Sequence, residues 1–203
     1  MSLQRLPMCA ELVNARHNNF SLVDLGCRTM DLKPLLRGCE AYLGTDMMPG
    51  DNVVQCDLEQ GLPQFEENSQ DVVVALDVLE HLENCHLILS EMLRVARKTV
   101  YISLPNMYYL SFRLRFMLKG NLSGKYSFPK DPILDRHRWV LSYNEAVNFI
   151  DHNTKGLEVF HHKIIPERGR TKLLLGRLER HLGDTYPDLF AYGSLHEIRV
   201  SDL

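Results

Sequence analysis

Four aspartates stand where apolar segments of the chain end, and their carboxylates could hold a nucleotide-like cofactor. Asp24 lies in the first of these turns, Asp46 follows 22 residues later, and Asp57 and Asp77 end two further apolar runs. A carboxylate at the end of the second strand of a nucleotide-binding sheet commonly accepts hydrogen bonds from the two ribose hydroxyls. The alternative for Asp46 is that it caps the turn at residues 47–50, a position that aspartate favours.

The first turn contains part of a cofactor-binding loop. Residues 22–31 read LVDLGCRTMD, an apolar strand that runs into Asp24 and Gly26. Arg28 and Met30 occupy two positions where further glycines would let the backbone approach a ligand. The Arg28 guanidinium could pair with a carboxylate of the ligand, or the side chain could point outward from a shifted loop. Met30 is flexible enough to fill a gap at the start of the next helix.

Alternating strands and helices must position these residues. In the first half of the chain, strand-type apolar runs and helical leucine spacing follow one another. The predicted strands are 21–26, 41–44, 52–56, 71–77 and 99–104, and the predicted helices are 31–37 and 87–96. This order implies right-handed crossovers and an α/β, Rossmann-like, doubly wound sheet that is mostly parallel. Ligands of such sheets bind beyond the carboxyl ends of the strands, where Asp46, Asp57 and Asp77 fall.

The second half of the chain has a different pattern. Ser142 and Glu145 have the spacing of a capping box and predict a helix over 142–150. A strand is predicted over 157–165, a basic amphipathic helix over 168–182 and a final strand over 190–200. The basic helix is of a kind that most often packs on a core, although peripheral contact with a membrane surface is an alternative.

The composition predicts a single domain over residues 1–203. The chain has 203 residues, of which 45% are apolar, enough for one good core. It has no apolar run near eighteen residues and no export signal at its start, so we expect neither a membrane span nor secretion. Its five cysteines lie far apart without a Cys-x-x-Cys pair. We therefore expect reduced thiols in the cytoplasm, with no disulfide framework and no metal site.

Residues 107–139 interrupt the alternation and form a predicted insertion, or lid, after the fifth strand. They hold seven Lys or Arg residues against two Asp, interleaved with aromatic residues, in a chain whose net charge is -3. Such a basic lid over the substrate side would suit a small or lipid-linked anionic acceptor. The alternative is a solvated basic loop whose aromatic side chains pack into the core.

Successive motifs of the chain resemble those of class I S-adenosylmethionine-dependent methyltransferases. The motifs are VDLGC at 23–27, GTD at 44–46, CDLEQGLP at 56–63 and DVVVALDVLEHL at 71–82. EMLRVAR at 91–97 and ISLPN at 102–106 are similar to the MetW-like branch. The resemblance is specific over 20–106, loose over 107–165 and only topological over 166–203. It implies a seven-stranded sheet whose last strand is antiparallel.

The resemblance also implies which residues hold S-adenosylmethionine and, after methyl transfer, S-adenosylhomocysteine. Asp24 and Gly26 would contact the methionine part of the cofactor, Asp46 the ribose, and Asp57 with Leu58 the adenine. Asp77 and Val78 would close the pocket. The full predicted cofactor set is Asp24, Gly26, Cys27, Arg28, Asp46, Met47, Asp57, Leu58, Asp77 and Val78.

Methyl transfer needs an aligned acceptor and, for a hydroxyl, a base. His81 and His137 are the candidate bases, with Tyr108 or Tyr109 as positioning groups; a locally satisfied histidine at a helix start is the alternative for His81. The chain has LDVL at 76–79 where amide and base N-methyltransferases usually have Asn-Pro-Pro-Tyr, so O-methylation is favoured and a nucleic-acid acceptor is not expected.

Two other classes of protein fit parts of the sequence. The departures at Arg28 and Met30 favour a non-catalytic member of the fold that acts as the partner of another enzyme, as MetW-like proteins are thought to do beside a homoserine acyltransferase. A nicotinamide-dependent oxidoreductase ranks last because no Gly-x-Gly-x-x-Gly follows the first strand.

Overall fold

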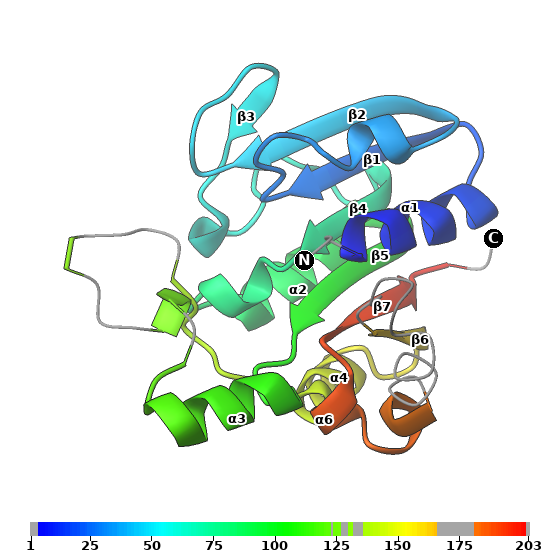
Figure 1. The fold of residues 1–203 in the computed structure, drawn as a ribbon. Coiled ribbons are helices and arrows are strands. Elements are labelled where there is room, and N and C mark those ends of the chain that lie inside the picture. The colour runs from blue at the N-terminus through cyan, green and yellow to red at the C-terminus, as the bar shows by residue number, and fades with distance from the viewer. Residues whose placement is uncertain (1–3, 123, 127–129, 132–135, 166–180, 202–203) are drawn as a thin grey trace.

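The computed structural model describes residues 4–122, 124–126, 130–131, 136–165 and 181–201. Its centre is a seven-stranded sheet in the order β3-β2-β1-β4-β5-β7-β6 (Figure 1). The strands are β1 (Phe20–Leu25), β2 (Cys39–Asp46), β3 (Val53–Gln55), β4 (Gln70–Leu76), β5 (Ala96–Pro105), β6 (Glu158–Ile164) and β7 (Gly193–Arg199). Strands β1 to β5 pair in parallel, and β7 is antiparallel to both β5 and β6. The predicted fold class is confirmed, including the antiparallel last strand.

The strands at the centre of the sheet are buried on both faces. In β4, the run from Asp71 to Ala75 is buried throughout, and Leu22 of β1 lies in register with Val72. Side chains of a strand alternate between the two faces, so a strand covered on both sides reads as a continuous apolar run. This pattern explains why β4 is easy to identify in the sequence.

Helices cover the two faces of the sheet. The helix α1 (Arg5–Arg16) lies in front of the sheet in Figure 1, and its Cys9 and Val13 belong to a buried cluster with Phe20 and Leu22. The other face is covered by α2 (Cys85–Val95) and α4 (Tyr143–Asn153), whose buried side chains form the larger cluster. Helices α3 (Leu110–Lys119) and α6 (Pro187–Phe190) lie beyond the carboxyl end of β5 (Figure 1).

The predicted capping box is present at the start of α4. The Ser142 hydroxyl accepts from the backbone N–H of Glu145, and the Glu145 carboxylate accepts from the backbone N–H of Ser142. Two backbone donors at the helix start are therefore satisfied by the pair.

The prediction of a helix over 31–37 is wrong. The segment forms only a short 3-10 helix, η1 (Lys33–Leu35), followed by an extended residue at Leu36. Pro34 lacks a backbone donor, and the segment is too short to recover the lost hydrogen bond by further turns. The crossover from β1 to β2 is therefore compact.

Helices α1, α3 and the short α6 were not predicted from the sequence. Helix α1 carries Leu6, Cys9, Ala10 and Val13, a helical spacing that buries one face on the sheet. Helix α3 lies inside the predicted insertion. The predicted basic helix at 168–182 falls almost entirely outside the described residues, and no helix of the described part is long and apolar enough to cross a membrane.

Candidate functional site

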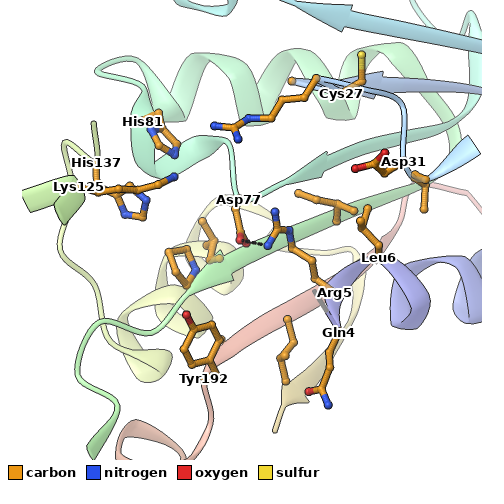
Figure 2. A pocket seen from close by; sticks show the side chains of 18 of the residues that line it. Gln4, Arg5, Leu6, Cys27, Asp31, Asp77, His81, Lys125, His137 and Tyr192 are labelled. Carbon is orange, nitrogen blue, oxygen red and sulfur yellow. Dashed lines mark ion pairs between the residues drawn. The ribbon is translucent and has the colours of Figure 1, made fainter. Parts of the chain in front are cut away.

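A cavity of about 900 Å³ opens at the carboxyl ends of β1, β4 and β5, a volume in the range of small-molecule sites. Its walls come from the turns after β1 and β4, the start of α1 and the insertion (Figure 2). Seven predicted site residues line it: Asp24, Gly26, Cys27, Arg28, Asp77, His81 and His137. The other predicted residues lie outside this lining: Asp46, Met47, Asp57, Leu58, Val78 and Tyr108.

The loop after β1 has a left-handed backbone at three alternate positions. Gly26, Arg28 and Met30 have φ values of 69°, 49° and 55°. A Cβ added at Gly26 would lie 2.7 Å from Cγ2 of Val78, so no larger residue fits there without movement. The two positions where glycine was expected thus keep the backbone that favours glycine, although L-residues pay about 1–2 kcal/mol each for it.

Asp46 connects this loop to the end of β2. Its carboxylate accepts from the backbone N–H of Arg28 and from that of Met48, each at 3.0 Å. The turn-capping interpretation of Asp46 therefore describes one of its contacts. Each carboxylate oxygen retains a second acceptor site, so a role toward ribose stays a prediction.

Asp24 is a buried carboxyl group on the cavity wall. The Tyr42 hydroxyl donates to it in a short hydrogen bond. Burial raises the pKa of Asp24 to about 7, against the opposing effect of the Tyr42 hydrogen bond and with a further increase from the Asp46 charge. Near neutral pH this group changes charge easily, and a cationic ligand beside it would favour the ionised form.

Asp77 joins the cavity to the first helix. Its backbone is left-handed at φ 55°, its Oδ1 accepts from the Ser103 hydroxyl at 2.6 Å, and its Oδ2 pairs with the Arg5 guanidinium at 2.9 Å (Figure 2). Arg5 was not among the predicted site residues, because α1 itself was not predicted. Its cation nevertheless lies in the cavity wall.

Asp57 and Leu58 sit at the start of the 3-10 helix η2 (Leu58–Gln60). The Asp57 carboxylate accepts from the backbone N–H of Glu59 at 3.1 Å, and Leu58 is buried in the core. Met47 is exposed in the turn after β2. None of these three residues lines the cavity, and their predicted contacts with the cofactor stay predictions.

The end of the insertion docks on the turn after β4, where the 3-10 helix η3 (Leu79–His81) lies. The backbone N–H groups of Arg138 and Trp139 both donate to the Glu80 carbonyl, at 2.9 and 3.2 Å, and the Arg138 Nε donates to the His81 carbonyl at 3.0 Å. This docking places the His137 ring 4.5 Å from the His81 ring, centroid to centroid. The two predicted bases, 56 positions apart in the sequence, are therefore neighbours in the cavity.

Glu80 was not predicted as a site residue, yet it lies beside both histidines. Its Oε1 is 3.8 Å from Nε2 of His81 and 3.9 Å from Nε2 of His137. Burial, together with the Asp77 charge, raises the pKa of Glu80 well above its ordinary value. The sequence signal that could have identified Glu80 is the Glu-His pair that follows the apolar strand β4.

Tyr108 lies away from the cavity. Its ring is exposed and stacks under the Arg113 guanidinium at 5.4 Å, and Arg113 also donates to the Tyr108 carbonyl. The predicted positioning role of Tyr108 has no support from this placement. Tyr109 is buried and packs edge-on against Tyr192 instead.

The strand order, the parallel first five strands and the cavity at their carboxyl ends define the fold of class I methyltransferases. Solved structures agree with this class. A putative methyltransferase in complex with the Haloferax volcanii Trm112 methyltransferase activator has a TM-score of 0.59 and 18% identity, covering 98% of this chain and 92% of that one. Magnesium protoporphyrin IX methyltransferase from Synechocystis PCC 6803, with bound SAH, has a TM-score of 0.58 and 15% identity, covering 98% of this chain and 82% of that one.

The chain belongs to the family described as methionine biosynthesis protein MetW, whose model matches residues 10–140. The bifunctional methionine biosynthesis protein MetXA/MetW of Rhodopirellula baltica (strain DSM 10527 / NCIMB 13988 / SH1) is 38% identical over 73 residues. That match covers 36% of this chain and only 12% of the relative.

Proposed function

We propose that the chain binds S-adenosylmethionine in the cavity after β1 and transfers its methyl group to a small or lipid-linked anionic acceptor. The observation that carries this proposal is the position of the cavity, at the carboxyl ends of the central strands and directly beside Asp24, Gly26 and Asp77. In doubly wound sheets this is where the ligand binds. We place the activity in the cytoplasm, because the five cysteines are free thiols.

The polar groups of the cavity suit a cofactor that carries both signs of charge. Asp24 and Asp77 would face the ammonium and sulfonium groups, and Arg28 would pair with the cofactor carboxylate. Asp46, on the other side of the loop, would accept from the ribose hydroxyls, with Asp57 near the adenine. Cys27, Met47, Leu58 and Val78 complete the proposed contact set.

The acceptor side of the cavity carries a basic group from the insertion. Lys125 lines the cavity next to His81 and His137. A cation there favours an anionic acceptor, and a histidine there could remove a hydroxyl proton as the methyl group is transferred. We therefore propose O-methylation in preference to N-methylation.

Thermal melting with and without cofactor tests the proposal. If the dissociation constant is about 10 µM, 1 mM cofactor stabilises the folded state by about 2.7 kcal/mol and raises Tm by roughly 5–10 °C. We expect Gly26→Ala to remove this shift, because its Cβ meets Val78 at 2.7 Å and its φ is 69°. No shift with either S-adenosylmethionine or S-adenosylhomocysteine at about 10 mM would contradict cofactor binding.

Gly120→Ala is the matched control. Gly120 also has a left-handed backbone, at φ 66°, but a Cβ there meets no atom within 4 Å. Both substitutions carry the same backbone cost, so only the one at the cavity should abolish the cofactor-induced shift. Loss of the shift in both variants would assign the effect to general destabilisation.

A second candidate function is that of a non-catalytic partner of an acyltransferase. Two observations favour it: MetXA and MetW are joined in the curated relative, and α3 exposes Leu114, Met117 and Leu118 on one side. Size-exclusion chromatography with a separately expressed MetXA-type protein tests it. Co-elution that Leu118→Asp abolishes would support this function, and separate elution at tens of micromolar would contradict it.

A further inference from the structure

Glu80 is a buried carboxylate with unmet bonding capacity. It is the residue before His81 in η3, its side chain is 0% exposed, and neither carboxylate oxygen has a hydrogen-bond partner among the described residues. A carboxylate in such a place costs several kcal/mol unless a proton, a cation or a metal ion compensates it. The groups around Glu80 decide which of these fits.

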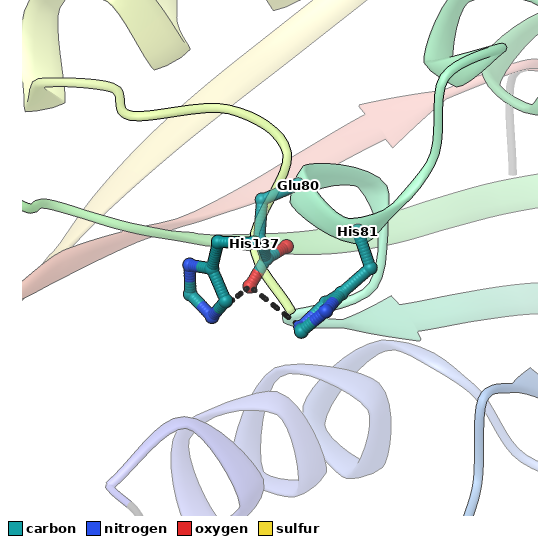
Figure 3. Close-up of side chains that lie close together, drawn as sticks. All are labelled: Glu80, His81 and His137. Carbon is teal, nitrogen blue, oxygen red and sulfur yellow. Dashed lines mark ion pairs between the residues drawn. The ribbon is translucent and has the colours of Figure 1, made fainter. Parts of the chain in front are cut away.

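Two imidazole rings turn toward Glu80 (Figure 3). His81 Nδ1 lies 2.9 Å from the Arg136 carbonyl oxygen, and because a carbonyl only accepts, Nδ1 carries the proton. His137 Nδ1 lies 2.5 Å from the Tyr126 hydroxyl, which is also 3.3 Å from the Trp139 carbonyl oxygen; when the hydroxyl donates to that carbonyl, it accepts from a protonated Nδ1. In neutral rings protonated at Nδ1, Nε2 is the atom able to bind a metal ion, and each Nε2 lies within 3.9 Å of Oε1 of Glu80.

The three groups have the composition of a metal site, and their ligand atoms lie close together. One ligand atom from each of Glu80, His81 and His137 lies within 4.8 Å of the other two. A metal ion at about 2.1 Å from each ligand separates them by roughly 3.0–3.4 Å, so Oε1 of Glu80 would have to approach each Nε2 by about 0.4–0.9 Å. Proton-bearing Nδ1 atoms held by a carbonyl or hydroxyl are the usual outer contacts of metal-binding histidines.

We propose that Glu80, His81 and His137 form a binding site for a divalent transition-metal ion on the wall of the cavity. Two imidazoles and one carboxylate suit Zn²⁺, Co²⁺ or Mn²⁺ better than Mg²⁺ or Ca²⁺, which prefer oxygen ligands. Both histidines line the cavity, so the remaining coordination positions of the ion open into it. No local sequence motif indicates this metal site, because its three ligands come from two segments about 56 positions apart.

The site would give the ion a role toward the acceptor. With the ion bound, the two histidines would be ligands and not bases. The cation would instead hold an anionic group or a hydroxyl oxygen of the acceptor and ease loss of the hydroxyl proton to water. This role rests on the proposed methyl transfer, whereas metal binding itself does not. An experiment can therefore contradict cofactor binding without contradicting metal binding, and the reverse.

Titration of the full-length protein with Co²⁺ tests the site in the absence of any cofactor. The protein is first treated with a chelator and desalted, and binding is followed by calorimetry and by the visible absorption of the bound ion. We expect saturable uptake in the micromolar range, with the absorption of nitrogen and oxygen ligation. Glu80→Gln, which keeps the shape of the side chain, and His81→Gln should each weaken binding by at least about 100-fold.

Two exposed residues provide matched controls. Glu66→Gln and His152→Ala remove the same groups from the surface and should leave Co²⁺ binding unchanged. Melting curves of all four variants exclude loss of fold as the cause. Absence of Co²⁺ and Zn²⁺ binding at 100 µM, or equal binding by wild type and Glu80→Gln, would overturn the site and indicate a carboxyl group that shares a proton with the histidines.

Discussion

Replacing Arg28 with glycine distinguishes the effect of its backbone conformation on stability from the effect of its side chain on cofactor binding. Arg28 has φ 49°, in the left-handed region. This conformation costs an L-residue about 1–2 kcal/mol, whereas glycine adopts it freely. Glycine also loses about 0.5–1 kcal/mol through the greater freedom of the unfolded chain. The net expectation for Arg28→Gly is a gain in unfolding free energy of about 0.5–1 kcal/mol, or roughly 2 °C in Tm for a chain of this size.

The cofactor affinity of the same variant tests the role of the side chain. If the Arg28 guanidinium pairs with the cofactor carboxylate, Arg28→Gly should weaken binding by about tenfold or more, since a charge-assisted hydrogen bond contributes about 1.5–3 kcal/mol. Arg28→Ala is the control that removes the side chain but keeps the left-handed strain. It should lose the same affinity without gaining stability.

Calorimetric titration with S-adenosylhomocysteine and urea unfolding of the three proteins provide both readings. Tighter cofactor binding by Arg28→Gly than by wild type would refute the pairing and show that the arginine obstructs the pocket. Equal unfolding free energies for the glycine and alanine variants would refute the backbone strain.

Three further predictions concern groups around the cavity and the core. Because the pKa of Asp24 is raised to about 7, this carboxyl group is protonated in the folded protein between pH 4 and 7, and a cationic ligand must displace the proton. Cofactor affinity should therefore fall about tenfold per pH unit below pH 7, and Asp24→Asn should abolish this pH dependence. Arg5→Ala removes a cation beside Asp77, so binding of the sulfonium cofactor should improve about fivefold relative to binding of its neutral thioether product, measured as the ratio of the two dissociation constants. An unchanged ratio would show that the Arg5 charge does not act on the bound cofactor. Ser142→Ala should lower the unfolding free energy by about 1 kcal/mol in denaturant melts through loss of the capping box, and Ser142→Asp should restore most of it.

The features that could be predicted from the sequence are those that local pattern determines. The apolar run of β4 and the acidic turn at Asp24 and Gly26 identify a doubly wound sheet and the edge where its ligand binds. Glycine was expected at two loop positions to let the backbone approach a ligand, and Arg28 and Met30 there adopt the left-handed backbone that favours glycine.

The features that could not be predicted depend on contacts between distant segments. The Arg5 cation reaches Asp77 only because α1 packs on the sheet. The amphipathic pattern of α1 is too weak to predict that helix from the sequence. His137 meets Glu80 only because the end of the insertion hydrogen-bonds to the turn after β4. The cysteine spacing argues against a zinc site of thiolates, but it has no bearing on a set of one carboxylate and two imidazoles.

Calorimetric titration of the intact chain with S-adenosylmethionine and S-adenosylhomocysteine tests cofactor binding most directly. We predict one saturable site for each compound, with a dissociation constant between about 1 µM and 1 mM, the range in which enzymes commonly hold their substrates. Absence of heat and of competition at several millimolar of either compound would contradict a cofactor cavity beside Asp24 and Asp77.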